Sequence, residues 1–278
     1  MTGASRGIGL EASLRLAQDG FRVWASMRDL NQAGPLLEEA RRRGVTLETV
    51  RLDVTDASSI DRAVEEILGR AGSLYGLVNN AGITRSAYFE DFPEEEVRRI
   101  FEVNVFGVMR VTRCVLPHLR AAGRGRIVML SSLGGRIASV CMSPYFSAKF
   151  ALEGFSEALL QEVAPLGIQV VIIEPGIVAT EIWDKDRQLL PAALDPRGPY
   201  YEWFRRAQAE TDRLLKSATV TPADVAAAIS RALISPQPRL RYVVGLRGKL
   251  FLSLRRHLPG ELFDRFYFRE VTRRLARR

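Results

Sequence analysis

The stretch TGASRGIG, residues 2–9, is rich in glycine and leads into a segment, residues 7–18, that is predicted to be helical. Glycines allow the backbone to turn tightly and to approach a pyrophosphate. The amino end of the helix offers free N–H groups and the positive end of its dipole. Loops of this kind connect a buried strand to a helix. Met1 alone precedes Thr2 in the sequence, so the motif predicts a phosphate-binding loop without an evident strand in front of it.

Helix-forming segments and apolar segments alternate along the first 246 residues. The predicted helices lie at 7–18, 35–43, 56–70, 93–119, 144–164 and 221–235, and the predicted strands at 21–26, 46–54, 75–82, 125–132, 168–176 and 240–245. Strands that are apolar on both faces and separated by helices indicate a parallel sheet covered on both sides. We therefore predict a single domain over residues 1–246 with a Rossmann-type, doubly wound α/β fold, which binds ligands beyond the carboxyl ends of its strands.

Two regions depart from this alternation. Residues 180–220 mix helix formers with prolines and aromatics, which predicts a long irregular insertion that could act as a lid. Residues 247–278 form a basic amphipathic extension that we expect to be helical. One interpretation is peripheral attachment to an anionic membrane. The other, which we prefer, is a helix pair packed near the ligand site or at a subunit interface, with solvated arginines.

The composition excludes several classes of protein. The chain is 47% hydrophobic and 26% charged, which is typical of a folded globular domain. Residues 253–278 carry a net charge of +5 and all the others together +3, so no nucleic-acid footprint covers the chain. No apolar run is long enough for a membrane span, and no secretory signal is evident, so we expect a cytoplasmic protein. Cys114 and Cys141 have no CxxC partner, and neither they nor His118 and His257 predict a metal site.

Tyr145 and Lys149 are the first candidate catalytic pair. Both fall on the helix predicted at 144–164, where positions four residues apart share one face. An ammonium beside a phenol favours the phenolate, so we expect Lys149 to lower the pKa of Tyr145 from its usual value of about 10. A tyrosine tuned in this way can give or take a proton at a carbonyl or alcohol oxygen.

Ser132 is the third candidate, because it ends the buried strand predicted at 125–132. A hydroxyl at the carboxyl end of a strand points into the ligand crevice and can hydrogen-bond a substrate oxygen. Ser131 competes for this role. Side chains alternate along a strand, so only one of the two hydroxyls can face the site.

Together these stretches resemble the short-chain dehydrogenase/reductase family, and most of all its hydroxysteroid and retinol dehydrogenase-like branch with its bacterial relatives. The resemblance covers about residues 1–180. The matching motifs are TGASRGIG at 2–9, Asp53-Val54, Asn79-Asn80-Ala81-Gly82, Asn104, Ser132, Tyr145 with Lys149, and Pro175-Gly176. The resemblance implies a nicotinamide-dependent oxidoreductase that interconverts a carbonyl and an alcohol.

The resemblance also implies a role for each matching residue. Tyr145 would be the general acid/base, and Lys149 would lower its pKa and bind the nicotinamide ribose. Ser132, favoured over Ser131 by its spacing to Tyr145, would hold the substrate carbonyl, and Asn104 would fix a water in a proton relay. The implied cofactor-binding residues are Gly3, Ser5, Arg6, Gly7, Ile8, Gly9, Arg28, Asp53, Val54, Asn80, Ala81, Gly82, Tyr145, Lys149, Pro175, Gly176, Val178 and Thr180.

The residues after the second strand bear on which nicotinamide cofactor is bound. Enzymes that prefer NAD place an acid there to hold the ribose 2′-hydroxyl. By alignment with the family, that position is Met27, and Arg28 follows it. Arg28 and Arg6 can both attract a 2′-phosphate, so we expect NADP(H) to be preferred over NAD(H). Asp29 is the counter-argument, although it falls two residues past the expected place.

The branch of the family suggests a lipophilic substrate, and the predicted lid carries side chains that could line an apolar pocket. They are Ile182, Trp183, Leu189, Leu190, Tyr200, Tyr201, Trp203 and Phe204. These residues could equally pack the lid against the body. The alternatives are a 3-oxoacyl-carrier-protein reductase and, in a different class, a non-catalytic NADP(H)-binding sensor. By analogy with the family we expect a homodimer or homotetramer that pairs through the helices at 93–119 and 144–164.

The resemblance sharpens the question raised by the first residues. In this family a buried apolar strand leads into the Thr-Gly of the phosphate loop and lies in the centre of the sheet. We therefore expect Met1 to lie inside or at the end of that first strand, with the natural start of the chain upstream.

Overall fold

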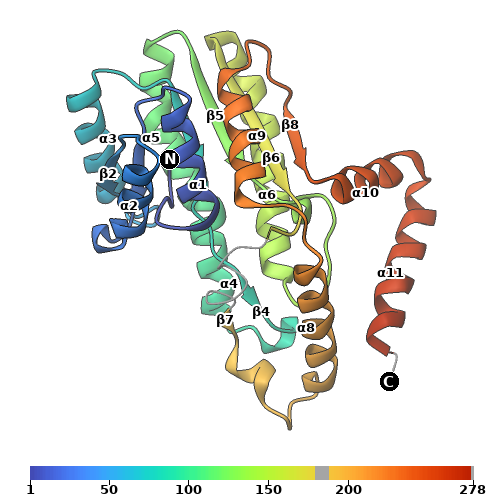
Figure 1. Ribbon diagram of the computed structural model, residues 1–278. Coiled ribbons are helices and arrows are strands. Elements are labelled where there is room, and N and C mark those ends of the chain that lie inside the picture. Colours follow the sequence, from blue (N-terminus) through green and yellow to red (C-terminus); the bar gives the residue numbers. More distant parts are fainter. Residues whose placement is uncertain (179–187, 277–278) are drawn as a thin grey trace.

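The computed structural model describes residues 1–178 and 188–276 (Figure 1). Its largest sheet has four parallel strands in the order β3 (Gly76–Asn79), β5 (Gly125–Leu130), β6 (Ile168–Pro175) and β8 (Arg241–Val244). A parallel pair, β1 (Trp24–Met27) and β2 (Glu48–Arg51), lies on the far side of β3. This is the predicted Rossmann-type, doubly wound α/β fold in a single domain.

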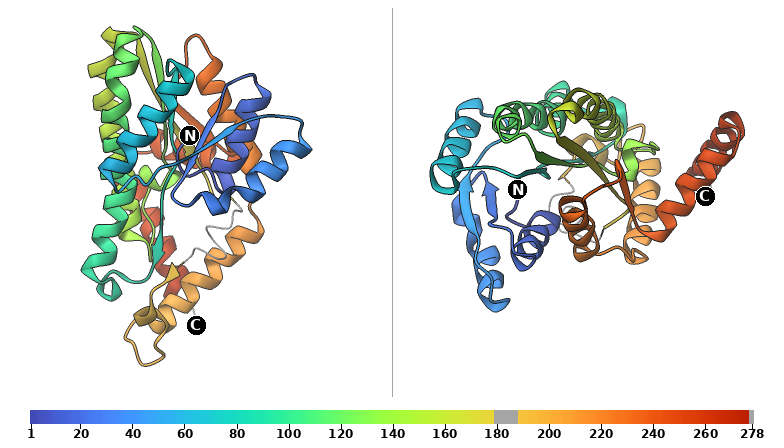
Figure 2. Two further views of the ribbon diagram at one scale, coloured as in Figure 1. Left: turned by 90° about the vertical axis from the view of Figure 1, so that its left-hand side faces the viewer. Right: turned by 90° about the horizontal axis from the view of Figure 1, so that it is seen from above.

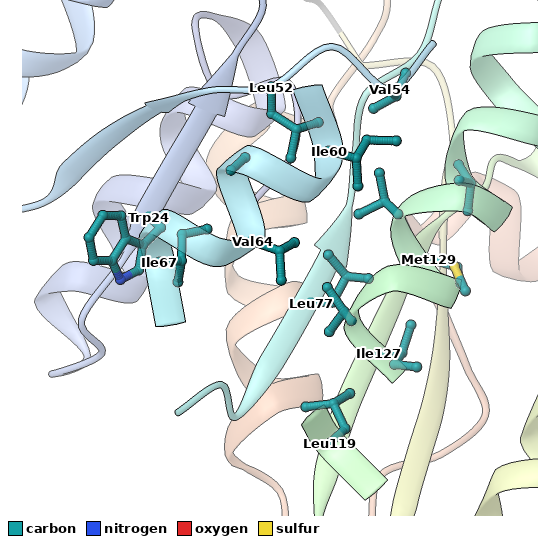
Figure 3. Close-up of a cluster of buried hydrophobic side chains, with 14 of the residues drawn as sticks. Trp24, Leu52, Val54, Ile60, Val64, Ile67, Leu77, Leu119, Ile127 and Met129 are labelled. Carbon is teal, nitrogen blue, oxygen red and sulfur yellow. The ribbon is translucent and has the colours of Figure 1, made fainter. Parts of the chain in front are cut away.

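Helices cover both faces of the sheet (Figure 2). On one face lie α3 (Ala57–Ala71), α5 (Val108–Ala121) and α6 (Ser143–Val163), and on the other α1 (Gly7–Gln18), α2 (Gly34–Arg42) and α9 (Pro222–Ile234). All six residues of β5 are buried, because a strand covered on both sides has no solvent-facing side. Figure 3 shows the hydrophobic cluster on the α3 and α5 face, which extends from Trp24 on β1 to Met129 on β5.

Two of the described helices, α3 and α9, begin at side-chain caps. The Asp56 carboxylate accepts a hydrogen bond from the Ser59 N–H at the start of α3. Thr221 and Asp224 form a reciprocal capping box at the start of α9. The long helix predicted at 93–119 is built from α4 (Glu94–Phe101), a π-helical segment (Glu102–Gly107) and α5.

The prediction of an irregular insertion at 180–220 is wrong for most of the part that the structure describes. Residues 188–216 contain β7 (Gln188–Leu189), which pairs with β4 (Arg85–Ser86), a 3-10 turn (Pro191–Leu194) and α8 (Tyr201–Lys216). The sequence after Pro199 has no proline until the end of α8, and Phe204 and Ala207 give that helix a buried side. Of the predicted lid residues, Ile182 and Trp183 lie outside the described ranges.

The two parts of the sheet are connected by the first residues of the chain. The Met1 amine donates to the carbonyl of Trp24 (3.0 Å), and the Ser26 N–H donates to the carbonyl of Met1 (2.9 Å). On the other side, the Thr2 N–H donates to the carbonyl of Val78 (3.0 Å). Met1 and Thr2 are therefore bonded like the last residues of a strand between β1 and β3.

The C-terminal extension is a helix pair, α10 (Leu246–His257) and α11 (Gly260–Ala276), that stands off the body (Figures 1 and 2). An aromatic cluster of Phe251, Phe263 and Tyr267 holds the two helices together. A salt bridge between Arg274 and Glu210 (2.9 Å) connects α11 to α8. Within residues 1–178 and 188–276, no helix has both the length and the apolar character needed to cross a membrane.

Candidate active site

The phosphate loop has the backbone that its glycines predict. Gly3 and Gly7 have positive φ angles of 65° and 55°, which side chains other than glycine rarely adopt. A Cβ atom on Gly3 would lie 2.9 Å from the Cα of Ala81, and one on Gly9 would collide with the carbonyl of Gly3. The loop therefore packs closely against the end of β3 and exposes the amino end of α1, which is a suitable site for a phosphate group.

Asn80 has a structural role that the sequence did not reveal. Its side-chain Nδ2 donates to the carbonyls of Thr2 and Gly3, both at 2.9 Å. In return, the Thr2 Oγ1 accepts from the N–H groups of Asn80 (2.9 Å) and Ala81 (3.0 Å). These bonds fasten the phosphate loop to β3, and no spacing in the sequence indicates that the two segments meet.

A cavity of about 340 Å³ opens at the carboxyl ends of β1, β3, β5 and β6. It brings together every predicted site residue in the described ranges except Asn104. Those residues are Gly3, Ser5, Arg6, Gly7, Ile8, Gly9, Arg28, Asp53, Val54, Asn80, Ala81, Gly82, Ser132, Tyr145, Lys149, Pro175, Gly176 and Val178. Thr180, the remaining predicted contact, lies outside the described residues.

Ser132, Tyr145 and Lys149 meet at one end of this cavity. Ser132 follows β5 and hydrogen-bonds the phenol of Tyr145, which opposes the rise in the pKa of that phenol. Lys149 lies one turn after Tyr145 on α6, with its Nζ 5.7 Å from the centroid of the tyrosine ring. The competitor Ser131 also lines the cavity, but its Oγ lies close to Gly135, where a Cβ would be 2.7 Å away.

The prediction that the pKa of Tyr145 is lowered is wrong for the protein chain alone. Burial raises the pKa of this phenol above its usual 10.0, since a phenolate loses hydration there. Burial also lowers the pKa of Lys149 to about 8, and the ammonium donates to the carbonyl of Leu130 (2.8 Å). The end of β5 thus holds the Lys149 side chain. In setting the pKa of Tyr145, desolvation outweighs the attraction between this ammonium and a phenolate.

Asn104 lies beneath the cavity in the π-helical segment and is 1% exposed. Its Oδ1 accepts from the Ile83 N–H (2.9 Å), and its Nδ2 donates to the Ile83 carbonyl (2.8 Å). A Cβ on Gly82 would lie 3.0 Å from the same Oδ1. Asn104 therefore fixes the chain that follows β3. Wide helical turns of this kind are frequent at functional sites.

A buried ionic cluster that sequence reasoning missed lies behind Lys149. Glu174 on β6 is fully buried and forms ion pairs with Arg136 (3.0 Å) and Arg241 (3.2 Å). Arg241 also bonds Glu153 (3.0 Å), one turn after Lys149 on α6. Burial raises the pKa of the Glu153 carboxyl, whose charge in turn partly offsets the lowering at Lys149. Arg241 on β8 thus connects α6, the helix that carries Tyr145 and Lys149, to the sheet.

The opposite end of the cavity is positively charged. Arg6 and Arg28 line it, and Asp53 is the one carboxylate among the described residues that do so. The side chain of Met27 occupies the position of the expected acid. The Asp29 carboxylate instead caps a 3-10 turn by accepting from the Asn31 N–H (3.0 Å), and Asp29 does not line the cavity.

Comparisons with known proteins agree with this geometry. A family model described as "short chain dehydrogenase" matches residues 1–190. Human 17-beta-hydroxysteroid dehydrogenase type 1 is 35% identical over 94% of this chain and 81% of its own. The NADPH-dependent 3-dehydrocapnine reductase of Ornithobacterium rhinotracheale is 32% identical over 98% and 96%. The crystal structure of a short-chain dehydrogenase from Streptomyces avermitilis is 35% identical, covers 98% of this chain and 95% of its own, and superposes with a TM-score of 0.78.

Proposed function

Because this chain belongs to the short-chain dehydrogenase family of oxidoreductases, we propose that it is an NADP(H)-dependent enzyme that interconverts a carbonyl and an alcohol on a lipophilic substrate. One observation carries the proposal. Ser132, Tyr145 and Lys149 share a single cavity with the phosphate loop, so a dinucleotide held by the loop can reach the proton-transfer group.

The residues around the cavity have distinct chemical tasks in this proposal. A bound nicotinamide dinucleotide supplies the hydride for reduction or accepts it in oxidation. Because burial raises its pKa, Tyr145 carries its proton at neutral pH and is ready to donate it to a substrate carbonyl oxygen. Ser132 hydrogen-bonds the same oxygen. Lys149, with a pKa of about 8, is mainly positive at neutral pH and stabilises the phenolate that remains.

The preference for NADP(H) rests on the charges at the other end of the cavity. Guanidinium groups bind a 2′-phosphate through charge-assisted hydrogen bonds, and a carboxylate would repel it. Arg6 and Arg28 line the cavity, whereas the carboxylate of Asp29 is engaged as a cap. The relative from Ornithobacterium, whose name specifies NADPH, supports the same preference.

An Arg28→Asp variant tests the cofactor preference. Loss of one charge-assisted contact worth about 1.5–3 kcal/mol predicts a roughly 10- to 100-fold smaller ratio of NADPH to NADH affinity. Dissociation constants for both cofactors are measured by titration of protein fluorescence. Arg41→Asp is a matched control, because Arg41 is exposed on α2 and does not line the cavity. An Arg28→Asp protein that retains the parent ratio refutes the assignment.

The nature of the substrate is supported by the apolar side chains in the cavity and by the steroid named in the human relative. Ile83, Val103 and Met142 line the cavity near the catalytic residues. The predicted lid residues Leu190 and Phe204 do not line it, and they are buried in the body of the protein. A panel of hydrophobic ketones and aldehydes, scored by consumption of NADPH, tests the activity. Turnover that survives Tyr145→Phe contradicts the assigned acid.

Assembly into a homodimer or homotetramer is a further part of the proposal. Phe106 and Phe150 are 49% and 43% exposed on the two long helical segments that we expect to pair with a partner subunit. Each of these aromatic side chains is available to pack against a partner subunit. Light scattering should show an oligomer that Phe150→Asp weakens, whereas a monomeric parent protein would contradict this assembly.

A further inference from the structure

Arg85 and Arg99 line the catalytic cavity together with Arg6 and Arg28. Arg85 belongs to β4, and Arg99 lies on α4, the helix beside that strand (Figure 1). The Arg85 side chain is 4% exposed. A buried guanidinium is costly unless charged or polar groups compensate for its lost hydration, so its surroundings show what this wall of the cavity can bind.

The ion pairs of these two arginines with the described residues leave this wall positively charged. The Arg85 Nε pairs with the Oε2 of Glu96 (2.8 Å), and its Nη1 donates to the carbonyl of Thr84 (2.8 Å). The Arg99 Nη1 lies 3.6 Å from the other carboxylate oxygen of Glu96. Within the described part of the chain, two guanidinium groups therefore share one carboxylate, and Glu96 itself does not line the cavity.

Thr84 adds a buried hydroxyl next to this charge. It lines the same cavity and is 5% exposed, and its Oγ1 makes no hydrogen bond to the described residues. A buried hydroxyl is costly to leave unpaired. Hydroxyl and guanidinium groups both donate hydrogen bonds, and an anionic oxygen is their strongest acceptor. Thr84 and Arg85 together therefore indicate a ligand that carries an oxyanion.

The contacts of β4 associate this donor pair with the substrate rather than with the cofactor phosphates. The Ala87 N–H, two residues after Arg85, donates to the carbonyl of Cys141 (2.9 Å). Cys141 precedes Met142, which lines the cavity directly before α6 begins. Helix α6 carries the proton donor Tyr145, whereas the phosphate loop precedes α1 at the other end of the cavity. An anion bound by Arg85 therefore belongs to the molecule whose carbonyl meets Tyr145.

We infer that the substrate is an apolar oxo acid or the corresponding hydroxy acid, and that Arg85 and Thr84 bind its acid group. This inference rests on the proposed interconversion of a carbonyl and an alcohol. In reduction, NADPH is oxidised to NADP⁺ as its hydride passes to the carbonyl carbon, and Tyr145 gives its proton to the carbonyl oxygen. The acid group is unchanged by the reaction and holds the substrate in place, while Ile83 and Met142 contact its apolar part.

Binding of unreactive probes, measured without turnover, tests the acidic substrate. The protein is titrated in a calorimeter with butyrate, hexanoate, octanoate and decanoate and with the amide of each acid, both with and without saturating NADP⁺. We expect at least one carboxylate to bind about tenfold or more tightly than its amide, because the amide keeps the apolar chain and loses the charge. Absence of carboxylate binding, or amides that bind equally well, would overturn the inference.

Variants of the two residues test where the acid group binds. Arg85→Gln should weaken the carboxylate about tenfold or more and leave the affinities for its amide and for NADPH unchanged. Thr84→Val removes an unpaired buried hydroxyl and keeps the shape of the side chain, so it should fold and weaken the carboxylate by roughly three- to tenfold. Arg98→Gln is the matched control, because Arg98 is exposed on α4 and does not line the cavity.

Two results with these variants would overturn the inference. An equal loss of NADPH and carboxylate affinity in Arg85→Gln would assign this arginine to the cofactor. If Arg85→Gln does not fold, a parent affinity for the carboxylate in Thr84→Val is the result that overturns it. The proposed activity is judged separately by consumption of NADPH. An inactive protein that still selects carboxylates would refute only the activity, and turnover of neutral ketones without such selection would refute only the acid site.

Discussion

In a protein that begins at Met1, protonation of the Met1 amine should destabilise the fold between pH 8 and pH 6. Burial lowers the pKa of this group from 8.0 to about 6, because the ammonium loses its hydration at the edge of an apolar cavity. In this pH range the unfolded chain binds a proton that the folded chain does not, so stability rises with pH. A difference of two pKa units corresponds to about 2.7 kcal/mol, present in full above pH 8 and lost as the pH falls to 6.

Acetylation of the Met1 amine isolates this effect. The acetylated protein keeps an N–H for the Trp24 carbonyl, but that group does not titrate. Urea unfolding is measured for both proteins from pH 5.5 to pH 8.5. The difference in their unfolding free energies should grow by about 2–3 kcal/mol toward low pH, or roughly 3–5 °C in Tm. A difference that stays constant across this range would refute the buried-amine reasoning.

Three further outcomes follow from contacts at the site. Asn80→Ala should weaken binding of NADPH by roughly tenfold in a fluorescence titration, since it removes two hydrogen bonds that hold the phosphate loop; an unchanged affinity would contradict the role of this side chain. Arg241→Met should lower the free energy of unfolding by about 3–5 kcal/mol because it leaves Glu174 incompletely paired in the interior, whereas the exposed Arg239→Met should cost under about 0.5 kcal/mol. Burial lowers the pKa of Lys149 from 10.5 to about 8, so the folded state favours the neutral amine and stability should rise by about 3 kcal/mol between pH 8 and pH 10.5. Lys149→Met should abolish this rise. A variant whose unfolding free energy, measured in urea, depends on pH as the parent's does would exclude this origin.

Local features of the sequence were sufficient to predict most elements of the fold. The continuous apolar runs predicted parallel strands, and β5 and β6 occur within the predicted ranges. The failure at residues 201–216 has a local origin, because prolines and aromatics before the helix obscured a regular helical segment. The place of helix α8 in the fold is set by the packing of Phe204 against residues that are far away in the sequence, and no local pattern reveals such contacts.

The sequence by itself determined the parts of the site that depend on short-range geometry. Gly3 and Gly7 need positive φ angles in a tight loop, and a spacing of four residues places Tyr145 and Lys149 on one side of a helix. Spacing of this kind is preserved in any fold that keeps the helix.

The tertiary structure decided which groups control these residues. Burial sets the directions of the Tyr145 and Lys149 pKa values, and it opposes the effect expected from the ion pair. Asn80 holds a loop that lies almost eighty residues earlier in the chain. Contacts of this kind are visible only once the strands are assembled, because burial and hydrogen-bond partners are properties of neighbours in space.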